Sequence, residues 1–194
     1  CICGHPKNII FLTCDAFGVL PLVSKLTYQQ AAYHFISGYT AKIPGTENGV
    51  KEPIATFSAC YGQAFIVWHP VIYAAKLIEN IKKYQNVNVW LVNTGWVGGK
   101  YGDENSSRCS LKITRGIIDS IHDGSLLDEE YETLSLFNLE YPKKYKNQWA
   151  DEFKYLDTKI ELAKLFINNF DKYDKTDTSL IDIETIKLSE SFNL

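Results

Sequence analysis

The segment that most constrains this chain is 89–115, where an apolar run leads into a glycine-rich turn and then into a basic segment. The run VWLV at 89–92 is typical of a buried strand. Glycines follow at 95, 98, 99 and 102, and the basic stretch 108–115 leads into a predicted helix at 115–122. A helix N-terminus near Thr114 favours an anionic ligand, such as a nucleotide, at the edge of a sheet. The glycine spacing matches neither a P-loop nor a dinucleotide fingerprint.

The remaining pattern predicts an α/β fold, with a helix-then-strand unit at 70–94. Apolar spacing predicts strands at 7–15, 88–92 and 131–139, and helices at 28–37, 70–84, 115–122 and 148–173. Thr27 and Pro70 are suited to begin two of these helices. The stretch 38–53 contains glycine and proline repeatedly, so we expect a loop, either functional or simply a solvated connection.

Composition limits the function classes that this chain can belong to. A length of 194 residues favours one domain, and a net charge of −3 provides no basic surface for nucleic acid or an anionic membrane. No apolar run approaches the ~20 residues of a membrane span. Five cysteines at irregular spacing favour a reducing, cytoplasmic location. Because the chain has no methionine and opens on CICGHP, we expect a piece of a longer protein.

Several long stretches carry a resemblance to a known family. They are HPKNIIFLTCDAFGVLP (5–21), VSKLT (23–27), YHFISGYTAK (33–42), GTENGVKEP (45–53), TFSACYG (56–62), VWLVNTGW (89–96), TRGIIDSI (114–121) and, more weakly, LAKLFINNFDKY (162–173). In this order they resemble the ATP-dependent phosphoenolpyruvate carboxykinases. The resemblance implies the carboxy-terminal portion of the nucleotide-binding (mobile) domain, an α/β fold whose mixed sheet has flanking helices. It covers residues 1–173 and leaves a polar tail at 174–194.

The resemblance also implies a reaction in gluconeogenesis. The family converts oxaloacetate and ATP to phosphoenolpyruvate, CO2 and ADP, with Mg²⁺ on the nucleotide and a second divalent ion, typically Mn²⁺. Its phosphate loop, metal ligands and oxaloacetate-binding arginine lie upstream of the part that this chain resembles. No Gly-Lys-Ser/Thr occurs in this sequence. We therefore expect a lyase fragment that has no catalytic or metal-binding residues of its own and is inactive alone.

Three residues correspond to family positions that hold the adenine end of ATP. The resemblance implies that Arg108 stacks on or flanks the base, that Cys109 offers backbone groups and that Thr114 donates a side-chain hydrogen bond. Cys109 stands where the family usually has an aliphatic residue. The acidic and polar stretch 103–107 replaces a glycine and a lysine, so the turn before Arg108 departs from the family pattern.

Other readings remain open from the sequence alone. The longer protein could have diverged from the enzyme, keeping the fold and the nucleotide contact but losing catalysis, so that this chain is part of a non-catalytic binding module. Alternatively, this chain could be only a stable scaffold domain. In the enzyme reading, the missing amino-terminal part completes the sites for nucleotide and oxaloacetate. The strands missing with it would leave sheet edges exposed, which favours self-association.

Overall fold

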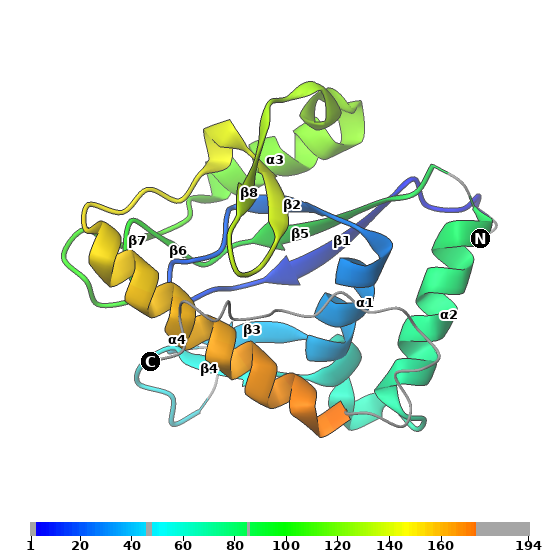
Figure 1. Ribbon diagram of the computed structural model, residues 1–194, viewed down its shortest axis with the longest axis horizontal. Helices are drawn as coiled ribbons and strands as arrows, with labels where there is room; N and C mark the ends of the chain where they lie inside the picture. Colours follow the sequence, from blue (N-terminus) through cyan, green and yellow to red (C-terminus); the bar gives the residue numbers. More distant parts are fainter. Residues whose placement is uncertain (1–2, 46–47, 85, 174–194) are drawn as a thin grey trace.

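The computed structural model describes residues 3–45, 48–84 and 86–173 of the chain. Figure 1 shows strands and helices interleaved along the sequence. The strands are β1 (Asn8–Thr13), β2 (Val23–Leu26), β3 (Tyr39–Lys42), β4 (Ile54–Phe57), β5 (Asn88–Asn93), β6 (Trp96–Val97), β7 (Ser107–Arg108), β8 (Tyr131–Leu134) and β9 (Leu139–Pro142). The helices are α1 (Tyr28–Ser37), α2 (Pro70–Lys83), α3 (Leu111–Asp123) and α4 (Glu152–Phe170). Short 3-10 helices lie at Ala59–Tyr61, Gln63–Phe65, Ser125–Asp128, Lys143–Tyr145 and Asp171–Tyr173.

The main sheet of the described residues is mixed, with strand order β1-β5-β2-β9-β8. β1 and β5 are parallel, with Asn8 opposite Asn88 and Thr13 opposite Asn93. β2 runs antiparallel to β5 and to β9, and β9 forms an antiparallel hairpin with β8. Parallel strands need a long crossover, and α1 and α2 belong to the one between β1 and β5. The predicted α/β class with a mixed sheet and flanking helices is confirmed.

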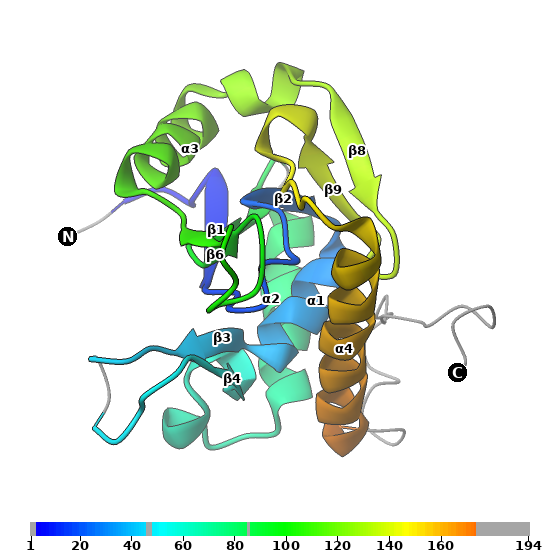
Figure 2. The same ribbon diagram turned by 90° about the vertical axis from the view of Figure 1, so that its left-hand side faces the viewer.

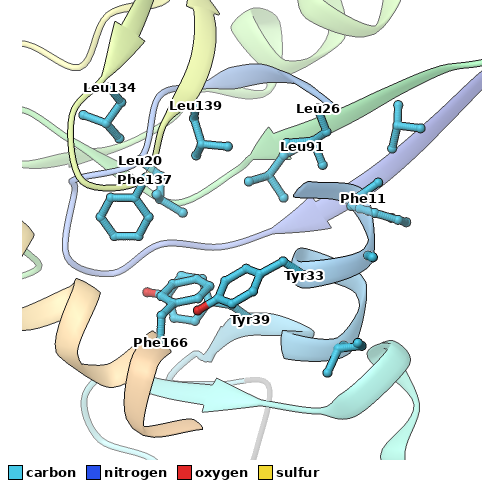
Figure 3. Close-up of a cluster of buried hydrophobic side chains, with 14 of the residues drawn as sticks. Phe11, Leu20, Leu26, Tyr33, Tyr39, Leu91, Leu134, Phe137, Leu139 and Phe166 are labelled. Atoms are coloured by element: carbon cyan, nitrogen blue, oxygen red, sulfur yellow. The ribbon is translucent and has the colours of Figure 1, made fainter. Parts of the chain in front are cut away.

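Successive side chains of β5 point to opposite faces of the sheet and so contribute to two separate cores. Val89 and Leu91 join a large core with residues of α1, α2 and α4, whereas Trp90 and Val92 join a smaller core with α3. Figure 2 shows α3 on the opposite side of the sheet from α1 and α2. The aromatic centre of the large core, including Phe166 of α4, appears in Figure 3. None of the described helices is long and apolar enough to cross a membrane.

Local capping signals explain two helices that were predicted well. Thr27 forms a capping box with Gln30, and α1 ends at Gly38, whose left-handed conformation suits glycine. Pro70 occupies the first turn of α2, where its missing N–H costs nothing. The predicted strand at 7–15 is confirmed as β1, and the predicted helix-then-strand unit is confirmed as α2 and β5.

Other element predictions need correction. The stretch 38–53 is not all loop, since its first residues form β3, which pairs antiparallel with β4. The single strand predicted at 131–139 is the hairpin of β8 and β9, whose turn places Leu136 and Asn138 at positive φ. α4 begins at Glu152 behind the Asp151 cap, later than the predicted start at 148. The predicted tail at 174–194 lies outside the described residues.

Candidate functional site

A buried asparagine joins the ends of the two parallel strands. β1 and β5 end at Thr13 and Asn93, which lie opposite each other, so the following residues emerge at one edge of the sheet. The Asn93 Oδ1 accepts hydrogen bonds from the backbone N–H groups of Asp15 (3.0 Å) and Gly95 (2.8 Å). Its Nδ2 donates to the carbonyl oxygen of Leu20 at 3.0 Å. Asn93 therefore fixes both turns to each other.

Asp15 organises the turn that follows β1. Its buried carboxylate accepts hydrogen bonds from the N–H groups of Phe17 (2.9 Å), Val19 (2.8 Å) and Leu20 (2.8 Å) and from the Tyr39 hydroxyl (2.8 Å). Burial raises the pKa of the Asp15 carboxyl, and these four donors act in the opposite direction. Because both oxygens are engaged inside the protein, Asp15 holds the turn in place rather than serving as an acid or base.

Two glycines allow the turns to cross at close range. A Cβ atom on Gly95 would lie 2.2 Å from the carbonyl oxygen of Asp15, a separation that no side chain can tolerate. Gly18, at φ +65°, lies equally close to Gly99, because a Cβ atom on Gly18 would be 2.1 Å from the Gly99 carbonyl oxygen. These glycines serve backbone packing, which sets the path of the chain toward β6.

The glycine-rich turn after β5 is not a phosphate cradle. A phosphate loop keeps successive backbone N–H groups free for its ligand. Here most of these groups donate within the chain. The N–H groups of Thr94, Gly95, Trp96, Gly98, Lys100 and Tyr101 donate to Thr13, Asn93, Asp15, Asn147, Asp103 and Ala16, respectively. The geometry thus agrees with the interpretation drawn from the glycine spacing.

Arg108 is presented on a short antiparallel arm formed by β6 and β7. Trp96 lies directly opposite Arg108 in this arm. The Arg108 Nε donates to the carbonyl oxygen of Thr94 at 3.3 Å, and the guanidinium carbon lies 5.7 Å from the centroid of the Trp96 ring. Arg108 is exposed and forms no ion pair with any described residue. Its terminal nitrogens and outer face are therefore accessible to a ligand.

The structure places Cys109 and Thr114 in contact, and Arg108 directly precedes Cys109 in the chain. Cys109 follows β7 directly, and its Sγ lies 3.6 Å from the Thr114 Oγ1 in the first turn of α3. The Cys109 side chain is buried, and its backbone N–H donates to the Gly95 carbonyl oxygen at 2.8 Å. The carbonyl oxygen is therefore the backbone group that Cys109 could offer to a ligand.

The predicted start of the helix near Thr114 is wrong. α3 begins at Leu111, and Ser110 is its cap, with an Oγ that accepts from the Ile113 N–H at 3.3 Å. Thr114 already donates its N–H to the Ser110 carbonyl oxygen, and its hydroxyl lies 3.4 Å from the same oxygen. The first turn carries exposed Leu111 and Ile113, so it lacks the inward apolar spacing that marks a helix in a sequence.

The acidic stretch 103–107 is tied to α4 by charged groups. The Lys154 Nζ lies 2.7 Å from the Asp103 Oδ1, while Asp103 Oδ2 accepts the Lys100 N–H at 3.0 Å. The hydrogen bond from Lys154 lowers the pKa of Asp103. Lys100 forms a second ion pair with Glu161 at 3.1 Å. The stretch 103–107, which departs from the family pattern, is thus held by contacts with α4, and Arg108 still lies on β7.

The described residues do not fit a metal ion. No group of three or more His, Cys, Asp or Glu side chains in ranges 3–45, 48–84 and 86–173 is placed to hold one. A polar hollow of about 240 Å³ lies beside the acidic stretch, and its lining includes the Lys154 cation as well as carboxylates. We therefore derive no chemical step through a metal from these residues.

Three residues important to this edge were given no role by the sequence analysis: Asp15, Asn93 and Trp96. Asp15 and Asn93 do carry a signal, since each is a polar residue at or just after the end of an apolar strand. Their partners lie far apart in the chain, so their hydrogen bonds cannot be read from spacing. The position of Trp96 opposite Arg108 depends on the pairing of β6 with β7, which the sequence analysis did not predict.

Comparison with known proteins gives a consistent result. The family model described as phosphoenolpyruvate carboxykinase matches residues 1–150. Phosphoenolpyruvate carboxykinase (ATP) of Campylobacter lari is 54% identical over 181 residues, which cover 88% of this chain and 34% of the relative. Phosphoenolpyruvate carboxykinase (ATP) 1 of Urochloa panicoides is 52% identical, over 89% of this chain and 29% of the relative. Phosphoenolpyruvate carboxykinase (ATP) of Dictyostelium discoideum is 50% identical, over 93% of this chain and 34% of the relative. The chain spans about a third of the length of these curated relatives.

Proposed function

Since this chain belongs to the family of ATP-dependent phosphoenolpyruvate carboxykinases, we propose that it supplies the adenine-binding end of such an enzyme. The whole enzyme would convert oxaloacetate and ATP to phosphoenolpyruvate, CO2 and ADP, as a cytoplasmic lyase of gluconeogenesis. The observation that supports this most strongly is the placement of Arg108, Cys109 and Thr114 side by side, beyond the carboxyl ends of β1 and β5. Ligands of open α/β sheets bind at such an edge.

Each proposed contact uses a group that the fold leaves within reach of the base. The guanidinium of Arg108 offers a planar face and terminal N–H donors. The Cys109 carbonyl oxygen can accept from an exocyclic amine, and the Thr114 hydroxyl can donate to a ring nitrogen by rotating away from Ser110. These contacts orient the nucleotide, and they transfer no proton or phosphoryl group.

The remaining parts of the reaction belong, in this proposal, to sequence outside this chain. Phosphoryl transfer requires groups that cradle the phosphates and neutralise their charge. The glycine-rich turn is poorly suited to be that cradle, because most of its N–H groups already donate within the chain. Mg²⁺ and Mn²⁺, when bound in the full enzyme, would supply charge neutralisation. The amino-terminal part would therefore complete the nucleotide and oxaloacetate sites, and this chain alone would be inactive.

Self-association is a further part of the proposal. Phe65, Val67 and Trp68 form an exposed apolar segment, with 89%, 87% and 67% of their surfaces accessible. Exposed apolar side chains grouped in this way usually mark a surface that packs against another protein surface. Copies of this chain would use the segment to associate with each other when no other surface covers it.

Calorimetric titration with ATP tests the nucleotide contact directly. We expect the chain to bind ATP weakly, and Arg108→Ala to weaken binding about tenfold, because a stacking and hydrogen-bonding partner of the base is lost. Lys164→Ala, an exposed cation on α4, is the matched control and should leave the affinity unchanged. An unchanged affinity in Arg108→Ala would overturn the assignment. Carboxykinase turnover by the chain alone would overturn the proposal that it is inactive.

A further inference from the structure

Trp96 and Arg108 form a cross-strand pair that the sequence analysis did not single out. They are directly opposite in the β6 and β7 arm, and the Cys109 N–H donates to the Gly95 carbonyl oxygen beside them. This pattern makes Trp96 and Arg108 a non-hydrogen-bonded pair, in which facing side chains come closest. The guanidinium carbon accordingly lies 5.7 Å from the Trp96 centroid, within the range of a cation–π contact.

The Trp96 ring is itself held in a fixed position. Only 8% of its surface is accessible, and it packs in a small cluster with Cys14 and Ala41. Its backbone N–H donates to the Asp15 carbonyl oxygen at 2.9 Å. The Tyr101 ring meets it edge-on, with centroids 5.3 Å apart and an interplanar angle of 88°. Trp96 is therefore a rigid platform beneath an exposed arginine.

Two contacts then determine where the guanidinium lies. The Thr94 carbonyl oxygen accepts from Arg108 Nε, and the guanidinium carbon lies over the Trp96 ring. The outer face and the terminal nitrogens remain accessible, and among the described residues no carboxylate competes for them. An arginine held in this way loses less conformational freedom when it meets a ligand than one that extends into solvent.

We propose that Trp96 is a positioning residue for the base of the nucleotide, acting through Arg108. Trp96 holds the guanidinium flat, so that the purine stacks on its outer face to give the order indole, guanidinium, purine. The inference rests on the proposed role of Arg108 in binding the base. It assigns to Trp96 no contact with the ligand, so every effect of Trp96 on affinity should pass through Arg108.

A double-mutant cycle with ATP as the probe tests this dependence. Trp96→Leu keeps an apolar side chain but removes the π face, and it should weaken ATP binding about threefold. Trp96→Phe retains an aromatic face and should restore most of the affinity. In an Arg108→Ala background, Trp96→Leu should change the affinity no further, because the group that it positions is absent. Trp149→Leu, at a partly buried tryptophan outside the β6 and β7 arm, is the control and should not change binding.

Two measurements separate positioning from damage to the fold. Urea unfolding midpoints identify any variant whose affinity falls because the chain is unfolded. The NMR signal of the Arg108 Nε–H group should be shifted upfield by the Trp96 ring current, and this shift should disappear in Trp96→Leu and persist in Trp96→Phe. Neither the signal nor its loss requires a bound ligand.

The possible outcomes distinguish this inference from the proposed function. If Arg108→Ala does not weaken ATP binding, the proposed function fails and this inference fails with it. If Arg108→Ala weakens binding while Trp96→Leu does not, only the inference is overturned. An equal loss from Trp96→Leu in both backgrounds would also overturn it, since that result identifies a structural role independent of Arg108.

Discussion

At the scale of single residues, the exposed edge is positioned by side chains that have no access to solvent. Asn93 and Asp15 are fully buried, and together they satisfy N–H groups in both turns at the end of the parallel strands. Leaving a buried polar group without a partner costs about 1–3 kcal/mol, so such networks keep one arrangement. Arg108 can therefore be surface-exposed and still be held near a fixed position.

The buried histidine His34 should make the stability of the chain depend on pH. It is packed edge-on against Phe166, and burial lowers its pKa to about 4. The unfolded chain, with a histidine pKa near 6.5, binds more protons between these values, so stability falls as pH decreases from about 6.5 toward 4. Between pH 7.5 and 4.5 we expect the wild type to lose about 2–3 kcal/mol more than His34→Gln in urea unfolding.

An exposed histidine provides the control for this pH dependence. His122 lies at the end of α3 and is exposed. Because folding does not bury its side chain, His122→Gln should lose as much stability at low pH as the wild type does. If His34→Gln and the wild type lose the same free energy on acidification, then His34 is not the group that couples folding to pH.

At the scale of elements, the sequence predicted what depends on local chemistry. The cap at Thr27 and the proline at the start of α2 placed two helices correctly, and continuous apolar runs placed β1 and β5. The capping and periodic signals act over a few residues, so they can be read directly. The family resemblance is the source of the prediction that Arg108, Cys109 and Thr114 bind the base, which spacing alone did not suggest.

Elements that depend on distant partners were not predictable in the same way. β3 forms because β4 pairs with it from across the connecting stretch, and the glycines and prolines between them suggested only a loop. The hairpin of β8 and β9 was missed because apolar residues continue through its turn, where Leu136 takes a positive φ that is unusual for its type. The network of Asp15, Asn93 and Tyr39 is likewise a product of tertiary structure.

The apolar segment after β4 should drive self-association of the chain. The N–H groups of Val67 and Trp68 both lie near the Tyr73 hydroxyl, at 3.2 and 3.3 Å, which holds the exposed side chains on a defined backbone. Replacing Phe65 and Trp68 together by serine should abolish a concentration-dependent rise in sedimentation coefficient, because the apolar area available for burial is lost.

A single exposed aromatic residue elsewhere is the matched control for this measurement. Phe153, on the first turn of α4, is also highly exposed, but no comparable apolar residue adjoins it in sequence. Phe153→Ser should leave the sedimentation behaviour unchanged. If Phe153→Ser reduces association as much as the double change at Phe65 and Trp68, the association is non-specific hydrophobic aggregation. If the sedimentation coefficient of the wild type does not depend on concentration, the chain does not self-associate.

At the scale of the whole molecule, the chain forms a mixed sheet with a core on each face. The sheet, the two cores and the arm of β6 and β7 are all formed by the described residues, 3–45, 48–84 and 86–173. The chain spans about a third of the length of its relatives. Under the proposed function, this part would hold the base, while sequence outside it would handle the phosphates, metals and oxaloacetate.

The most direct test of this account is to locate the base on the chain by NMR titration with adenosine, which has no phosphates. We predict that backbone and side-chain signals shift at 94–96 and 108–114, with Arg108 among the most affected, while the acidic stretch 103–105 changes little. Largest shifts at the glycine-rich turn 98–102, or shifts that do not involve Arg108, would contradict the claim that this edge holds the adenine.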